Sequence, residues 1–272
     1  MYIKKTKRNL FLKFIHSSKF QSMKIFKANF VYLSIAAFIF LQVPILIAGS
    51  GPDYSKKSIL NTSKPVEKNK AEIIIERADS IYNSIQLVAA GLNEQAFELA
   101  YTGYNKLIES GMVGRPEIIT IADFSKASNE KRLYVINLLE GKLLFHTLVA
   151  HGRNSGTNYA TEFSNKPSSY KSSLGFYLTL DPYIGDNGYS LKLEGLEKGI
   201  NDKAYSRAIV IHGSDYVSDQ IANNGTIGRS FGCPAVPLKQ SKSIINTVKK
   251  GSVLFIYHPN KNYLNQSDLL KS

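Results

Sequence analysis

The sequence predicts a mainly β fold of the α+β class, preceded by a small helical hairpin. From residue 117 onward, short apolar runs rich in β-branched residues alternate with turn residues, as in successive strands. Residues 67–112 instead carry apolar side chains at helical spacing. The chain has 272 residues, of which 43% are hydrophobic and 20% charged, so it can bury one large core.

Residues 1–50 have the composition of an export leader. They contain eight Lys or Arg residues and no acidic residue, and the apolar run 30–48 is followed by the small residues 48–50. Cleavage before Gly51 would release the rest of the chain, and Met23 opens a better-proportioned signal than Met1. The alternative is an uncleaved anchor, because a run of about nineteen residues just spans a bilayer. We expect an exported protein of the periplasm or cell envelope, which touches membrane only through a retained leader.

The net charge of +13 suggests nucleic-acid binding at first, but much of it lies in the leader. The remaining 222 residues hold 26 basic and 21 acidic residues, and no nucleic-acid-binding motif is present. A mildly basic exported protein suits an anionic polymer such as a cell wall. We therefore expect no nucleic-acid partner.

The expected elements follow in order along the chain. A polar linker, 51–66, leads to a first helix over 67–90, with Gly91 as its stop. Its apolar stripe consists of Ile74, Ala78, Ile81, Ile85 and Val88. A second helix starts at the N-cap Asn93 and ends at Gly111. Its apolar face consists of Phe97, Tyr101, Tyr104 and Ile108. We interpret the pair as a hairpin packed on the main domain.

The main domain, 113–260, is expected to contain strands, one late helix at 239–250 and a Glu140-Gly141 hairpin turn. The strands are expected at 118–123, 132–138, 142–150, 174–180, 208–211 and 252–257. The short apolar run 208–211 is typical of a strand buried on both faces. The polar tail 261–272 is expected to add little to the fold.

The chemistry concentrates in residues 207–237. The run 208–211 ends in His212-Gly213, and Cys233 follows in the glycine-containing segment 228–234. Cys233 is the sole cysteine, so it cannot form an internal disulfide in an oxidising compartment. Such a cysteine is often buried and inert. With a histidine base, however, it can act as a thiolate nucleophile.

The neighbours of His212 and Cys233 suggest supporting roles. Gly213 would let the backbone turn and bring a carbonyl to the His212 Nδ1 atom, with Asp215 as a rival orienting group.

Oxyanion donors must come from Phe231, Gly232 or Cys233, because Pro234 has no N–H. Arg229 would either hold a substrate carboxylate or form a salt bridge within its own loop.

A zinc site is the metal-binding alternative, with His151, His212 and Cys233 as ligands. The sequence contains no closely spaced ligand pair of the CxxC or HExxH type. We therefore expect no metal.

With these residues in hand, the chain resembles the L,D-transpeptidase (YkuD-type) catalytic domain family, in its murein L,D-transpeptidase branch. The resemblance covers roughly 92–258 and rests on the segments 123–152, 172–177, 183–213 and 228–237. It implies a β-sandwich or mixed-sheet catalytic domain, Cys233 as nucleophile, His212 as base and Gly213 as the residue whose carbonyl orients the base. Ser230 and Gly232 match the signature.

Two departures from the family pattern stand out. Phe231 occupies the position of a common histidine, and Pro234-Ala235 replace an aliphatic residue followed by Arg or Asn. We expect a monomer, and the resemblance implies that it acts on peptidoglycan without a cofactor. Its thiol would attack the third residue of a tetrapeptide stem, and an amine (3→3 cross-linking) or water (trimming) would resolve the thioester. The alternatives are a cysteine hydrolase of another amide and a non-catalytic wall-binding protein.

Overall fold

One mixed sheet of eight strands organises residues 70–271, the part of the chain that this computed structural model describes. Its spatial order is β3-β2-β1-β8-β4-β5-β6-β7. The pairs β1–β8 and β6–β7 are parallel, and the other neighbours are antiparallel. The strands are β1 Ile118–Asp123, β2 Leu133–Asn137, β3 Lys142–Thr147, β4 Gly175–Gly185, β5 Gly188–Gly195, β6 Val210–Ser214, β7 Ala235–Pro237 and β8 Val253–Tyr257. The predicted mainly β fold of the α+β class is confirmed.

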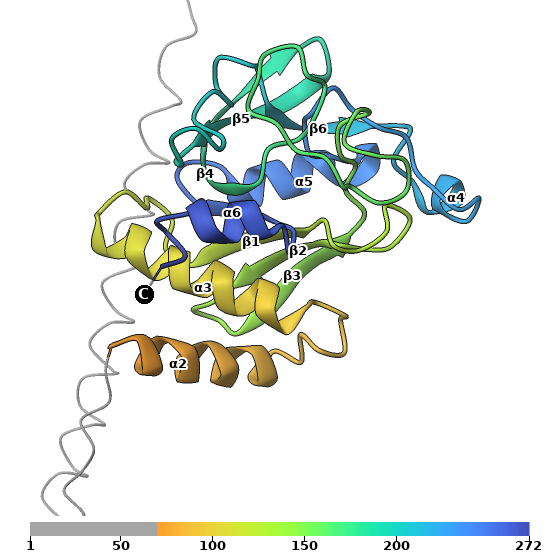
Figure 1. Ribbon diagram of the computed structural model, residues 1–272. Helices are drawn as coiled ribbons and strands as arrows, with labels where there is room; N and C mark the ends of the chain where they lie inside the picture. Colours follow the sequence, from red (N-terminus) through yellow and green to blue (C-terminus); the bar gives the residue numbers. More distant parts are fainter. Residues whose placement is uncertain (1–69, 272) are drawn as a thin grey trace, which may run out of the picture. The chain divides into compact units, whose positions relative to one another are not determined.

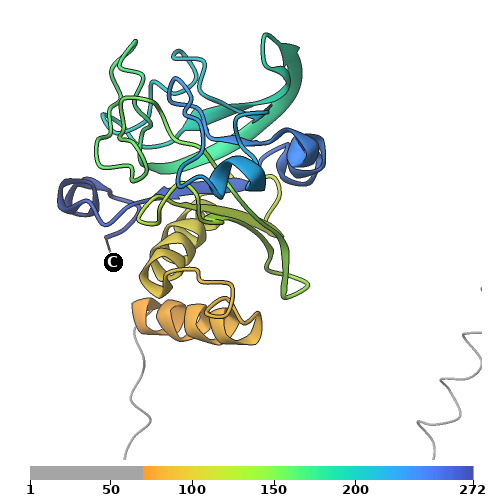
Figure 2. The ribbon, with the colours of Figure 1, turned by 90° about the vertical axis from the view of Figure 1, so that its right-hand side faces the viewer.

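The sheet curls towards a barrel around helix α5, Leu238–Val248 (Figures 1 and 2). This helix contacts β1 near one end of the strand order and β5, β6 and β7 at the other. Its apolar side chains Ile244, Ile245 and Val248 are fully buried. Burial of these side chains between the two halves of the sheet supplies hydrophobic stabilisation and holds the curl.

Helices α2, Lys70–Ser84, and α3, Glu94–Glu109, form the predicted hairpin beneath the sheet (Figure 1). Asn93 caps α3 as expected, accepting a hydrogen bond of 3.0 Å from the Ala96 N–H. A Cβ at Gly103 would lie 2.1 Å from the Phe176 ring, so glycine lets α3 approach the sheet closely.

The first helix is shorter than the sequence predicts. It ends at Ser84, because Gln86 has φ +56° and the chain turns until Gly91. Val88, expected on the apolar stripe, therefore lies outside the helix and is 69% exposed.

The stretch after 180 forms a long hairpin that sequence patterning did not identify. Strand β4 continues to Gly185 and turns at residues 186–187 into β5. Pro182 lies in β4, where the pairing register shifts between Thr179 and Pro182. Such a bulge tolerates a residue without an N–H, which is why proline does not end the strand.

The expectation that residues 261–272 add little is wrong. Helix α6, Lys261–Gln266, buries Tyr263, whose hydroxyl donates to Glu197 at 3.3 Å. The Ser267 hydroxyl donates to the same carboxylate, which also accepts from the Phe176 N–H at 2.7 Å. Burial raises the pKa of Glu197 above its ordinary value. The buried carboxyl thus fastens the C-terminal segment to the sheet.

The expected leader, 1–50, and linker, 51–66, lie outside the described residues. A short helix, α4 Asp219–Ala222, completes the elements of the described part. Within residues 70–271, no helix combines the length and apolarity needed to cross a bilayer.

Candidate active site

His212 lies in the middle of β6, the strand next to the edge strand β7. It pairs with Ser190 of β5 on one side and Ala235 of β7 on the other. Its Nδ1 atom is 3.1 Å from the Gly213 carbonyl oxygen, which places the proton on Nδ1 and leaves Nε2 as an acceptor. Burial lowers the pKa of His212, although this hydrogen bond opposes the shift. The resting imidazole is therefore neutral and able to accept a proton.

The sequence suggested that Gly213 turns the chain, but Gly213 instead continues strand β6. Its glycine identity instead reflects close packing against α5. A Cβ at this position would lie 2.5 Å from the Ser241 Oγ atom. Asp215, the rival orienting group, is exposed and accepts a long 3.5 Å contact from Ser214, while the carbonyl of Gly213 holds the ring.

The Cys233 thiol is partly buried in the loop that leads into β7, two residues before that strand begins. It accepts from the Val210 N–H at 3.5 Å and lies 3.6 Å from the Ala208 carbonyl oxygen. Ala208, whose carbonyl contacts the thiol, has φ +54°, which is uncommon for a residue other than glycine. Burial raises the pKa of the thiol above its ordinary value, and the Val210 N–H and the Arg207 charge oppose that shift. The sequence suggested a low-pKa thiolate; the structure instead describes a protonated thiol that needs a base.

Cys233 and His212 are neighbours in register. Extending the β6–β7 pairing back from Ala235 places Cys233 beside Val210, two residues along β6 from His212. The Cys233 sulfur itself lies against the backbone of this part of the chain, where it meets the Val210 N–H and the Ala208 carbonyl. The structure records no hydrogen bond between these two described side chains. Catalytic contacts often tighten only when substrate binds.

The loop before Cys233 is fixed by serine hydroxyls. Ser230 Oγ donates to the Cys233 carbonyl at 2.6 Å and accepts from the Gly232 N–H at 3.0 Å. Ser172 Oγ donates to the Gly232 carbonyl at 3.1 Å. Gly232 has φ +125°, and a Cβ there would lie 2.8 Å from the Lys171 carbonyl oxygen, so only glycine fits.

These hydrogen bonds distinguish the three expected oxyanion donors from one another. The Gly232 N–H is already bonded to Ser230 and is not free for a substrate oxygen. The N–H groups of Phe231 and Cys233 have no acceptor among the described residues, and they remain as the available donors.

The side chains of Arg229 and Phe231 contact neighbouring loops. The Arg229 guanidinium donates to the carbonyls of Gly156 at 3.0 Å and Arg153 at 3.3 Å, which fits a role in holding loops together. Phe231 is 63% exposed and lies against the Tyr170 ring, with centroids 4.9 Å apart.

Arg207 is the site residue that sequence reasoning missed. Its half-buried guanidinium donates only to neutral oxygens: Ser164 O at 2.7 Å, Ser173 Oγ at 2.6 Å, Lys171 O at 2.7 Å and Ser169 Oγ at 3.3 Å. Its positive charge opposes the rise that burial causes in the pKa of Cys233, because the charge favours the thiolate. The only sequence signal was an arginine immediately before the strand that carries the histidine.

His151 is not available to a zinc site with His212 and Cys233. Its Nδ1 atom is 2.8 Å from an Arg132 nitrogen, and its Nε2 atom is 3.3 Å from the Gly156 carbonyl oxygen. Across residues 70–271 no three His, Cys, Asp or Glu side chains are grouped as metal ligands.

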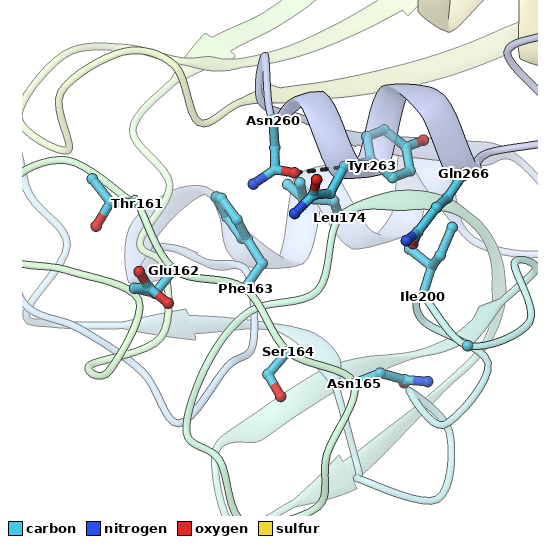
Figure 3. Close-up of a pocket in the computed structure, with 12 residues that line it drawn as sticks. Thr161, Glu162, Phe163, Ser164, Asn165, Leu174, Ile200, Asn260, Tyr263 and Gln266 are labelled. Carbon is cyan, nitrogen blue, oxygen red and sulfur yellow. Dashed lines mark hydrogen bonds between the residues drawn. The ribbon is translucent and has the colours of Figure 1, made fainter.

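Two cavities matter for the position of the site. One, of about 220 Å³, is lined by Ala208 and Val210, whose backbone groups contact the thiol. Another, of about 390 Å³, lies between the 161–165 segment and α6 and contains none of the predicted site residues (Figure 3). The first cavity therefore shares two residues, Ala208 and Val210, with the surroundings of the thiol.

The chain matches a known family of catalytic domains. A family model described as "L,D-transpeptidase catalytic domain" matches residues 88–257. A search of curated proteins finds no match.

Among solved structures, an L,D-transpeptidase from Mycobacterium smegmatis is 12% identical, with 52% of this chain and 59% of that chain covered and a TM-score of 0.33. The helical cell shape determining protein Pgp2 from Campylobacter jejuni is 18% identical, with 53% and 48% covered and a TM-score of 0.33. An L,D-transpeptidase from Xylanimonas cellulosilytica is 14% identical, with 56% and 68% covered and a TM-score of 0.31. The chain thus spans 59% of the length of the first and 48% of the second.

Proposed function

The chain belongs to the L,D-transpeptidase catalytic domain family, whose chemistry is related to peptidoglycan, and on this premise we propose that it is a cysteine L,D-transpeptidase. The observation that carries the proposal is the pairing of β6 with the Cys233 segment. It places a partly buried thiol beside the strand of a neutral imidazole whose tautomer is fixed by the Gly213 carbonyl. A nucleophile with an oriented base is the arrangement that acyl transfer requires.

The first half-reaction forms a thioester. His212 Nε2 takes the thiol proton as Sγ attacks the carbonyl carbon of the third residue of a tetrapeptide stem. The Cys233 and Phe231 N–H groups stabilise the developing oxyanion. The C–N bond then breaks, the imidazolium gives its proton to the departing D-Ala amine, and the acyl group stays on sulfur.

The second half-reaction resolves the thioester. An amine of another stem attacks the acyl carbon while His212 accepts its proton, and the thiolate leaves and is reprotonated. The product is a 3→3 cross-link. Water in place of the amine gives a trimmed tripeptide. Arg207 stabilises the thiolate in both halves through its charge.

Incubation of the full chain with a tetrapeptide muropeptide tests the proposal. Mass analysis should show cross-linked dimers, tripeptides or both, and Cys233→Ala should abolish them. A carbapenem should add its mass to the wild-type chain and not to Cys233→Ala. Turnover that persists in Cys233→Ala would contradict the assignment of the nucleophile. Binding to sacculi without any product would favour a wall-binding protein, and cleavage of unrelated amides alone would favour a hydrolase.

We further propose that the protein is exported to the periplasm or cell envelope and acts as a monomer. The support for export is the basic, apolar and small-residue order of residues 1–50. Cell fractionation should find the protein in the envelope fraction and lose it there when 24–48 are deleted. Light scattering of the purified chain checks the monomer.

A further inference from the structure

The cavity of about 220 Å³ that is lined by Ala208 and Val210 contains a cation with no acidic partner among residues 70–271. Lys192 lines it, together with the rings of Tyr183 and Tyr205. The Lys192 ammonium lies 5.4 Å from the Tyr183 ring centroid and 5.9 Å from that of Tyr205. It forms no hydrogen bond or ion pair with any residue between 70 and 271. None of the side chains that line this cavity is acidic.

The cavity and the Cys233 sulfur both contact the same residue, Val210. Lys192 is paired with Val210 across β5 and β6, and the Val210 N–H contacts the Cys233 sulfur at 3.5 Å. The ammonium and the thiol therefore flank the same residue.

Resting on the function proposed above, we propose that this cavity is the subsite for the terminal residue of the donor peptide, where Lys192 binds its C-terminal carboxylate. The bond that breaks is one residue from the chain end, so this carboxylate is the charge closest to the reacting carbonyl. An ammonium held over two aromatic rings, without a competing acid, complements it. The tyrosine rings provide the walls for a small side chain.

A second cation near the nucleophile provides a matched control. Arg153 lies over the rings of Tyr170 and Phe231, with its guanidinium carbon 4.2 and 4.8 Å from their centroids. It also lacks an acidic partner within the described part of the chain. Arg153 lines neither of the two cavities described above.

The experiment compares two donors, a tetrapeptide stem with a free C-terminus and the same stem with a C-terminal carboxamide. For the wild-type full chain we expect kcat/KM to fall about tenfold on amidation. Lys192→Met keeps the apolar stem of the side chain. Relative to the wild type, this variant should lose the same factor in kcat/KM on the free-acid donor and nothing on the amide donor. The effects of the substitution and of amidation therefore do not multiply. Lys192→Arg should restore most of the preference, and Arg153→Gln should leave it unchanged.

The proposal is overturned if Lys192→Met reduces both donors equally or neither, or if Arg153→Gln is the variant that loses the preference. A binding assay separates this outcome from failure of the proposed reaction. Cys233→Ala should bind the free-acid peptide about tenfold more tightly than the amide, and Cys233→Ala combined with Lys192→Met should bind both equally. Equal binding of the two peptides to Cys233→Ala also overturns the subsite. Absence of turnover in the wild type with the binding preference intact counts only against the reaction.

Discussion

His151 should make the stability of the domain depend on pH between about 6.5 and 4. The ring is fully buried and lies between the Arg132 guanidinium, which donates to Nδ1, and the Gly156 carbonyl, which accepts from Nε2. Protonation of Nδ1 would break the first hydrogen bond and place a second positive charge beside a buried cation. Burial, followed by the Arg132 charge, lowers the pKa of His151 to about 4.

The expected loss follows from linkage. In the unfolded chain His151 takes up a proton near pH 6.5, whereas in the folded chain it does so only near pH 4. As the pH falls through this window the unfolded state binds more protons, so the free energy of unfolding decreases. At about 1.4 kcal/mol per pH unit, the decrease amounts to about 3 kcal/mol.

Urea unfolding of the wild type and of His151→Gln, measured at pH 7.0, 5.5 and 4.5, tests this value. Glutamine can accept from Arg132 and donate to Gly156, but it does not titrate. Other groups titrate equally in both chains, so their contributions cancel in the difference between the two curves. As the pH falls, we expect the free energy of unfolding to decrease by roughly 2 to 3 kcal/mol more for the wild type than for His151→Gln. Parallel curves for the two chains would refute the reasoning.

Three further results are expected. The alkylation rate of Cys233 by iodoacetamide should keep rising beyond pH 9, because burial raises the pKa of the thiol; a plateau at neutral pH would indicate a stable thiolate. Arg207→Gln should slow alkylation at pH 8 severalfold by removing a nearby positive charge, while Arg207→Lys should slow it less; equal rates in all three chains would deny the charge any role. Gly213→Ala should lower the free energy of unfolding by about 1–3 kcal/mol through overlap with Ser241, and adding Ser241→Gly should recover much of it; a loss unchanged in the double variant would place the strain elsewhere.

The candidate site could be proposed from the sequence because its residues are recognisable locally. The apolar run leading to His212, the single Cys233 and the glycine at 232 are visible as residue types and spacing. The helical hairpin and the first strands also followed from periodicity, since their apolar faces lie within one window of the chain.

What sequence reasoning missed depends on contacts between distant segments. Arg207 is important because four oxygens from the 164–173 region hold its guanidinium near Cys233, and no local pattern encodes that arrangement. The tail appeared dispensable because its anchor, Glu197, lies about seventy residues earlier. The β4–β5 hairpin was hidden by Pro182, which is tolerated only because the register shifts there.

The position of β8 determines when this domain can fold. It lies between β1 and β4, yet it follows every other strand of residues 70–271 in sequence, so the continuous pairing from β1 to β4 depends on residues 253–257. Strands β1 and β4 can join one continuous sheet only after residues 253–257 have been synthesised, and pairing over such sequence separations is slow. Truncation before residue 253 would remove this strand and leave helix α5 and the Ala150–Ala235 bridge as contacts between the two halves.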